Sequence, residues 1–127
     1  MRFVITGRIP SKKNSRRAIY VHGRTIMIAS KDHEAWHKAA ALELRVQMPR
    51  KLILSGPNCV TIALYPPNKV RGDLTNKAES IMDLLVDCGV LRDDNWDEVP
   101  EVNLIFAGVS RENPRAEIKV ERIKNKK

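Results

Sequence analysis

Hydrophobic positions follow two different periods along the chain, and the change of period marks the predicted elements. Short β-rich runs predict six strands, at 2–7, 18–21, 25–29, 59–65, 102–107 and 116–123. Ser30 as a cap and the prevalence of Ala, Leu, Glu and Lys predict a helix over 30–48, which Pro49 ends. Apolar residues at helical spacing predict a second helix over 75–88, which Gly89 ends. The order β-β-β-α-β-α-β-β predicts an α+β fold. It is a single domain over 1–127, with two main helices packed on one face of a mixed or antiparallel sheet.

The predicted helix over 75–88 has an apolar side and an acidic side. At about 100° per residue, its core-facing stripe contains Ala78, Ile81, Met82, Leu85 and Cys88. The opposite side contains Asn76, Glu79, Asp83 and Asp87. Like charges four residues apart disfavour a helix by a few tenths of a kcal/mol, and a bound cation would remove that penalty. The acidic side therefore indicates either a metal site or an ordinary solvated surface.

Charge is distributed unevenly along the chain. Nine of the fifteen acidic residues lie between Asp73 and Glu101, a window whose basic residues are Lys77 and Arg92. The whole chain nevertheless carries a net charge of +8. A basic protein attracts phosphate, whereas a cluster of carboxylates repels phosphate unless a divalent cation lies between them. The leading hypothesis is a metal-dependent enzyme acting on nucleic acid, and a generally basic, soluble protein is its alternative.

Carboxylates flank this helix at both ends. Asp73 precedes the helix, and Asp93 and Asp94 follow it after a short connection. Mg²⁺ takes carboxylate oxygens and keeps several waters, so two or three carboxylates suffice to bind it. Asp73 also stands where a side chain could cap the helix, which is a sufficient structural reason for its presence. Both interpretations stay open at this point.

Residues 33–37 (HEAWH) match a zinc-protease signature, in which two histidines bind zinc and a glutamate activates water. The longer form of the signature continues with glycine and histidine, and this chain has neither at those positions. We therefore expect an ordinary amphipathic helix, with His33 and Glu34 on its exposed side and Trp36 packing inward.

Two further patterns bear on the setting of the protein. Cys59 and Cys88 are far apart and belong to no C-x-x-C pair, so a reduced, cytoplasmic setting is expected. No apolar run is long enough to predict a signal peptide or a membrane span. The basic tail at 124–127 is expected to be mobile.

Four short segments resemble one known family. They are IPSKKN at 9–14, RGDLTN at 71–76, MDLL at 82–85 and CGVLRDD at 88–94, and they are similar to RusA-type Holliday junction resolvases. These proteins are endonucleases of phages and prophages. The resemblance covers most of the chain. It implies a homodimer in a bacterial cytoplasm that binds branched DNA, the four-way junction. It also implies symmetric nicking of two strands with Mg²⁺ or Mn²⁺ and without a small-molecule cofactor.

The resemblance assigns roles to individual residues. The first metal aspartate of the family matches Asp73, and the aspartate after the helix matches Asp94. The helix aspartate matches Asp83, and the motif asparagine matches Asn76. These matches imply that Asp73 and Asp94 are metal ligands, with Asp93 and Asp94 folding back beside the helix or along a neighbouring strand.

Two positions depart from the family pattern. Thr75 stands where the family has a second aspartate, and Glu79 stands where its best-known members carry a functional lysine. Glu79 could supply the missing carboxylate and Lys77 the missing positive charge. The predicted catalytic residues are therefore Asp73, Asp94, Glu79, Asp83 and Lys77. The predicted metal ligands among them are Asp73, Asp94 and Glu79.

Basic and polar side chains near these segments are predicted to contact DNA, mainly through backbone phosphates. They are Lys12, Lys13, Asn14, Arg16, Arg17, Lys69, Arg71 and Asn76. Because aromatic residues are few, junction shape and charge are expected to dominate recognition over base stacking. The alternative from another class is a catalytically silent protein that binds branched DNA, in which the changes at Thr75 and Glu79 have removed metal affinity.

Overall fold

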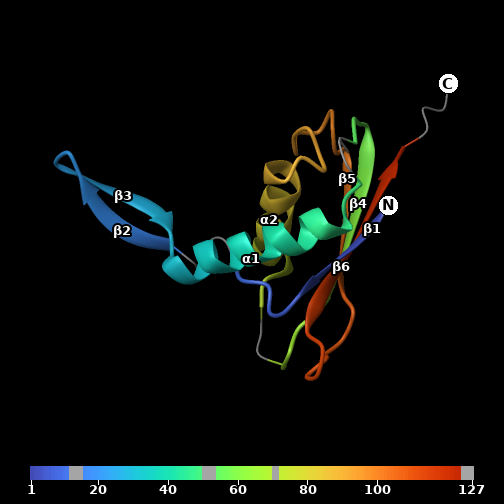
Figure 1. Ribbon diagram of the computed structural model, residues 1–127, viewed down its shortest axis with the longest axis horizontal. Coiled ribbons are helices and arrows are strands. Elements are labelled where there is room, and N and C mark those ends of the chain that lie inside the picture. The colour runs from blue at the N-terminus through green and yellow to red at the C-terminus, as the bar shows by residue number, and fades with distance from the viewer. Residues whose placement is uncertain (12–15, 50–53, 70–71, 124–127) are drawn as a thin grey trace.

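The computed structural model describes residues 1–11, 16–49, 54–69 and 72–123. Eight elements follow one another in the predicted order (Figure 1). They are β1 (Arg2–Thr6), β2 (Arg16–Val21), β3 (Arg24–Ala29), α1 (Lys31–Gln47), β4 (Asn58–Tyr65), α2 (Leu74–Asp87), β5 (Glu101–Phe106) and β6 (Arg115–Arg122). The α+β class is thus confirmed. The tail at 124–127, expected to be mobile, lies outside the described residues.

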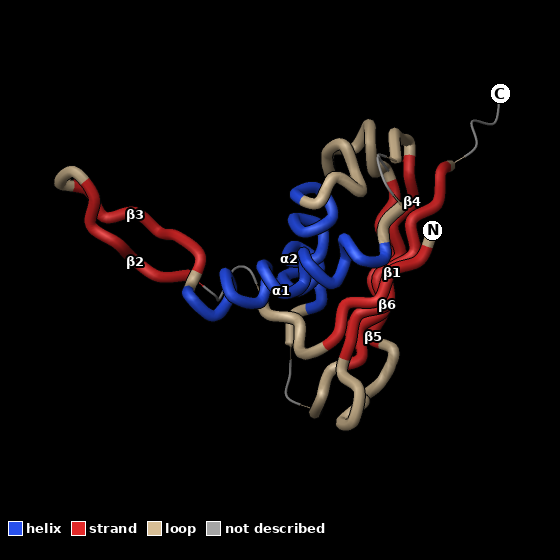
Figure 2. Tube along the Cα trace, in the orientation of Figure 1, coloured by secondary structure: helices blue, strands red, loops and turns tan. Residues whose placement is uncertain are grey.

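Four strands form a mixed sheet in the order β1-β6-β4-β5. β4 and β5 are parallel, whereas the other neighbouring pairs are antiparallel. Figures 1 and 2 show α1 and α2 together on one face of this sheet, as predicted. Because β4 and β5 are parallel, their carboxyl ends lie side by side, close to the segment that leads into α2.

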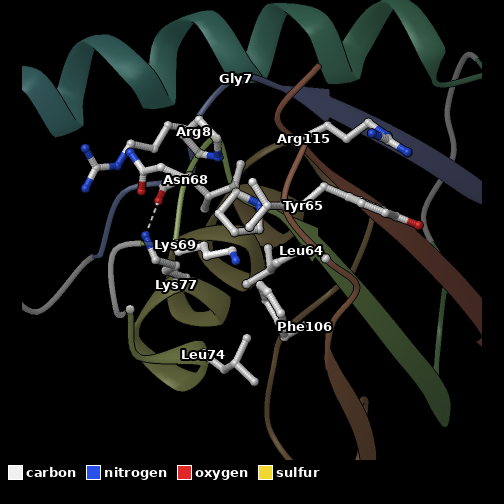
Figure 3. A pocket seen from close by; sticks show the side chains of 16 residues that line it. Gly7, Arg8, Leu64, Tyr65, Asn68, Lys69, Leu74, Lys77, Phe106 and Arg115 are labelled. Atoms are coloured by element: carbon white, nitrogen blue, oxygen red, sulfur yellow. Dashed lines mark hydrogen bonds between the residues drawn. The ribbon is translucent and has the colours of Figure 1, made fainter. Parts of the chain in front are cut away.

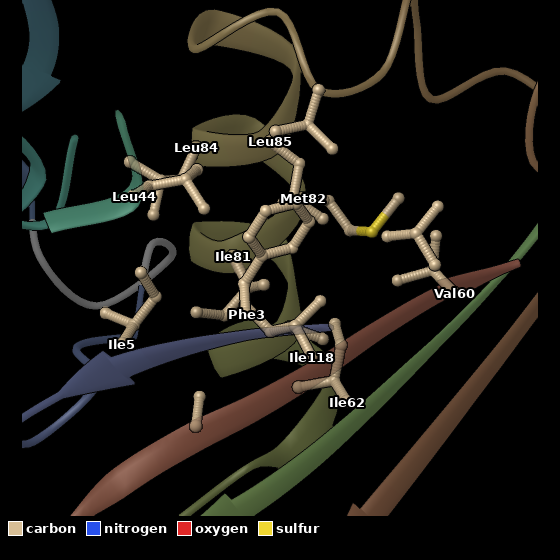
Figure 4. Close-up of a cluster of buried hydrophobic side chains, with 14 of the residues drawn as sticks. Phe3, Ile5, Leu44, Val60, Ile62, Ile81, Met82, Leu84, Leu85 and Ile118 are labelled. Carbon is tan, nitrogen blue, oxygen red and sulfur yellow. The ribbon is translucent and has the colours of Figure 1, made fainter. Parts of the chain in front are cut away.

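Alternation along the strands builds the core beneath the helices. Every second residue of β4 is buried, namely Asn58, Val60, Ile62 and Leu64. The buried residues of β6 are Ala116, Ile118 and Val120. The stripe of α2 that packs on this sheet includes Ile81, Leu84 and Leu85, which are fully buried (Figure 4). Each such side chain contributes about 1.5–3 kcal/mol on burial, so α2 is firmly anchored and its two ends have fixed places.

Local signals set the bounds of both helices. The Ser30 hydroxyl accepts a hydrogen bond from the His33 amide at 3.1 Å and begins α1. Gly89, with a φ of 77°, ends α2, and the Val90 amide donates back to the Leu85 carbonyl at 2.9 Å. In the described part of the chain, neither helix has the length and apolar character needed to cross a bilayer.

The hairpin formed by β2 and β3 differs from the predicted single sheet. The two strands pair with each other as a separate two-stranded sheet, and they project beyond the start of α1 (Figures 1 and 2). Its turn is His22-Gly23, where both residues have positive φ, the conformation of a tight two-residue turn. Alternation predicts a strand but does not tell which sheet the strand joins, and the separation of the hairpin was therefore not foreseen.

The expected exposure of His33 was wrong. His33 is 6% exposed, and its Nε2 lies 3.2 Å from the hydroxyl of Ser80 on α2. Ser80 donates its single hydroxyl proton to the Pro10 carbonyl at 2.8 Å, so His33 Nε2 must donate to Ser80. His37 has a different partner, the Asp87 carboxylate at 3.0 Å. His33 therefore joins α1 to α2, and its polar partner on the facing helix explains how a histidine is accommodated in the core.

Candidate active site and nucleic-acid interface

Asp73 caps α2, and its carboxylate is held by two residues of the predicted motif. Its Oδ1 accepts hydrogen bonds from the Thr75 amide at 3.0 Å and from the Thr75 hydroxyl at 2.7 Å. Its Oδ2 accepts from Asn76 Nδ2 at 3.2 Å. Capping by Asp73, which the sequence left as one of two interpretations, is thus confirmed and contributes about 1 kcal/mol. The carboxylate remains exposed and can still face a ligand.

Lys77 lies one helical turn after Asp73 and is half-buried. Its Nζ donates to the Ile9 carbonyl at 2.9 Å. Burial lowers the pKa of the Lys77 ammonium below its ordinary value, and the positive charge of Arg8 lowers this pKa further. A Cβ at Gly72 would lie 2.6 Å from Lys77 Cε, so the backbone at Gly72 runs directly over the lysine stem. Lys77 is thus a partly desolvated cation beside the start of α2.

Asp93 and Asp94 lie in the connection that follows α2. The Asp94 amide donates to Asp93 Oδ1 at 2.7 Å, and Asn95 Nδ2 donates to Asp93 Oδ2 at 3.3 Å. All three residues are exposed. The Asp93 side chain therefore organises the local turn, and the Asp94 side chain stands on the surface.

The two predicted metal aspartates lie at opposite ends of α2. The helix has 14 residues and is therefore about 21 Å long. Asp73 precedes its first residue, and Asp94 follows its last residue by seven positions. Figure 1 shows the segment after α2 beyond the carboxyl end of the helix, away from its start. Among the described residues, no three His, Cys, Asp or Glu side chains gather in a metal-binding arrangement.

The other predicted acids lie along α2 between these ends. Glu79 and Asp87 are exposed, and Asp83 is half-buried. The pairing of Asp87 with His37 of α1 gives one member of the acidic side a basic partner that the sequence of α2 alone does not show.

Several predicted DNA contacts lie outside the described residues, namely Lys12, Lys13, Asn14 and Arg71. The side chain of Arg16, another predicted DNA contact, also lies outside what the structure describes. Arg17 lies 3.7 Å from the Glu34 carboxylate and connects the hairpin to α1. Lys69 is exposed at the rim of a cavity.

That cavity, of about 560 Å³, opens at the carboxyl ends of β4 and β5 beside the start of α2 (Figure 3). Its apolar wall includes Leu64, Pro66, Leu74, Phe106 and Val109. Among the described residues that line it, the cations are Arg8, Lys69, Lys77 and Arg115, and none is acidic. The Arg115 guanidinium lies 3.8 Å from the centre of the Tyr65 ring and 2.8 Å from the Glu117 carboxylate.

Sequence reasoning missed Arg8, Phe106 and Arg115 as parts of this site. Pro66-Pro67 showed that β4 ends there. However, only the parallel pairing of β4 with β5 brings Phe106 next to Leu64, and only the antiparallel pairing with β6 brings Arg115 next to Tyr65. No local sequence signal reports these contacts.

A basic α+β protein with a fixed carboxylate next to a cavity rich in cations has the features of an enzyme that acts on a polyanion. Comparison with protein families agrees with this class. The model of the endodeoxyribonuclease RusA family matches residues 10–121, so the chain belongs to this family of endodeoxyribonucleases. The resemblance seen in the four motif segments is confirmed. No curated protein matches the chain.

Proposed function

We propose that this protein is a divalent-metal-dependent DNA endonuclease that resolves four-way (Holliday) junctions by paired, symmetric nicks. Its role would lie in DNA recombination and repair, in the cytoplasm of a bacterial host. The family match supports the endonuclease activity. The main structural support for the location of the active site is the Asp73 carboxylate. Thr75 and Asn76 hold it one helical turn from Lys77.

The donor set fits a hard cation. Exposed carboxylate oxygens held in place by hydrogen bonds are ligands that suit Mg²⁺ or Mn²⁺. When bound, such an ion would activate water and neutralise charge on the phosphate. Thr75 and Asn76 orient Asp73, while Lys77, partly removed from water, attracts a phosphate more strongly than a fully solvated lysine would. Lys69 stands on the same side of the molecule to contact the DNA backbone.

The distance between the two ends of α2 supports a homodimer. Mg²⁺ binds its ligands at about 2.1 Å, so two carboxylates that share one ion must lie within a few ångströms of each other. In one chain, Asp73 stands before the first residue of α2 and Asp94 lies in the segment after its last residue, and the helix between them is about 21 Å long. A centre that uses both residues would therefore combine Asp73 of one protomer with Asp94 of a second. Two such centres in a symmetric dimer would account for paired nicks.

The alternative is a silent protein that binds branched DNA, and Thr75 is the residue that favours it. Thr75 contributes a neutral hydroxyl that donates to Asp73, where the family pattern has a carboxylate. One negative charge fewer weakens the attraction for a divalent cation. DNA binding by the basic residues would not depend on that charge.

Incubation with a labelled four-way junction and a linear duplex of the same sequence separates these possibilities. We expect paired, symmetric nicks in the junction alone, with Mg²⁺ or Mn²⁺ and not with EDTA. Asp73→Asn should abolish nicking yet keep the fold, because asparagine caps a helix as well as aspartate. Asp97→Asn, which changes an exposed acid in the loop after α2, is the matched control. Junction binding without nicks in either metal would instead identify the silent binder.

A further inference from the structure

The cavity beside α2 has walls of two kinds. Leu64 and Phe106 end the parallel strands β4 and β5, and with Pro66 and Leu74 they form an apolar surface. Arg8, Lys69 and Lys77 stand around it (Figure 3). The volume of about 560 Å³ lies within the range of small-ligand sites. The cavity therefore suits a molecule with a flat or apolar part and an anionic part.

The charge of the cavity is not compensated by its own walls. No carboxylate of the described residues forms an ion pair with Arg8, Lys69 or Lys77, whereas Arg115 is paired with Glu117. The charge of Arg8 acts unfavourably on the half-buried Lys77 ammonium. An anion placed between these two side chains would relieve that repulsion, which makes a phosphate the fitting partner.

The cavity also borders the candidate active site. Gly72 and Leu74 line it, and these are the neighbours of Asp73 on either side. A group held in the cavity would lie close to whatever the Asp73 carboxylate acts on. At the centre of a branched DNA, stacking between the arms is interrupted, so a base there loses fewer stacking contacts when it leaves the helix than a base inside a continuous duplex.

From these observations we propose that the cavity holds one unpaired nucleotide of the branched DNA next to the cut phosphate. Its base rests on Phe106 and the apolar wall, and its phosphate lies between Arg8, Lys69 and Lys77. This inference rests on the proposed function and deepens it, because it gives the site a way to select among junction sequences. A single base bound in this way adds local selectivity to recognition that is otherwise governed by shape and charge.

The test uses four-way junctions that carry 2-aminopurine at successive positions near the crossover, mixed with the full-length protein in EDTA so that no cutting occurs. A base that leaves the stack gives a severalfold rise in fluorescence. We expect this rise at one position with the wild type, its loss with Phe106→Ala, and its retention with Ile105→Ala. Phe106 and Ile105 are neighbours on β5 with similar exposure, 58% and 45%, and Ile105 does not line the cavity.

Anisotropy of the same junctions reports binding independently. The nucleotide site is refuted, while the proposed function stands, if the junction binds but 2-aminopurine fluorescence rises at no position. The same holds if the fluorescence rises with Phe106→Ala as much as with the wild type. If the junction does not bind at all, both fail.

A second measurement addresses the phosphate. The 5′-monophosphate of 2-aminopurine deoxyriboside should bind the protein severalfold more tightly than the nucleoside. Arg8→Gln should remove that preference, and Arg111→Gln, an exposed arginine outside the cavity, should keep it. Equal binding of nucleotide and nucleoside by the wild type would exclude a phosphate subsite.

Discussion

Thr75 shows how one residue can alter a metal site without changing the fold around it. Its hydroxyl holds the Asp73 carboxylate at 2.7 Å, in the position where the family pattern has a second carboxylate. We expect Thr75→Asp to lower stability in EDTA, because two carboxylates two residues apart repel each other. The same substitution should increase the stabilisation by Mg²⁺, because a further carboxylate raises affinity for the ion.

Thermal unfolding at increasing Mg²⁺ concentrations measures both effects. Thr75→Ser, which keeps the hydroxyl, serves as the control and should follow the wild type. A Mg²⁺-dependent shift in Tm that is no larger for Thr75→Asp than for the wild type would contradict a metal site at Asp73.

Lys77 gives the stability of the protein a dependence on alkaline pH. Burial lowers the pKa of its ammonium in the folded state below the ordinary value of 10.5. Between the lowered pKa and 10.5 the unfolded chain binds more protons than the folded chain, so this lysine makes stability rise with pH across that window. Urea unfolding of the wild type and of Lys77→Met should therefore show a difference, wild type minus variant, that increases toward high pH. A difference that decreases would contradict the desolvation of Lys77.

At the scale of elements, Gly89 fixes where α2 ends and where the acidic connection begins. Its φ of 77° belongs to the left-handed region, and a Cβ there would meet no atom within 4 Å. The cost of Gly89→Ala is therefore a backbone cost, about 1–2 kcal/mol of unfolding free energy. Gly89→Asn should cost less, because asparagine tolerates this conformation. Equal losses for both variants in urea unfolding would show that steric contact, and not backbone conformation, sets the requirement for glycine.

The elements were predictable where their signals are local. Ser30, Asp73 and Gly89 begin or end helices through their own hydrogen bonds and backbone angles, and each is visible in the sequence. The burial of His33 depends on Ser80, which lies 47 positions away on another helix. The cavity likewise depends on the pairing of β4 with both β5 and β6. The burial of His33 and the cavity both depend on contacts between distant segments, and the hydrophobic pattern of the sequence does not predict such contacts.

At the scale of the whole molecule, α2 acts as a spacer as well as a core helix. Its buried stripe fixes it against the sheet, and its length of about 21 Å lies between Asp73 and the segment that holds Asp94. The sequence pointed to both aspartates, but it could not show that one chain keeps them separate. Under the proposed function, a second chain is therefore needed to complete the metal site that the motif residues begin.

Mixed dimers test that arrangement directly. Asp73→Asn and Asp94→Asn should each abolish junction nicking, while binding is preserved or strengthened because a negative charge near phosphate is removed. A dimer with one protomer of each kind would contain one centre with both aspartates intact and one centre with neither. We expect such dimers, purified through two different tags, to recover nicking of one strand at a time without the paired second cut.

The control is a mixed dimer of Asp73→Asn with Asp97→Asn. This dimer keeps one intact centre whether a centre lies within one protomer or is shared between two, so its activity confirms that mixed dimers form and bind. If that pair nicks the junction while the Asp73→Asn and Asp94→Asn pair stays as inactive as either parent, the two aspartates do not share a centre across the dimer. Recovery in both pairs would mean that the 14 residues of α2 hold apart two halves of a site that dimerisation brings together, making nuclease activity dependent on assembly.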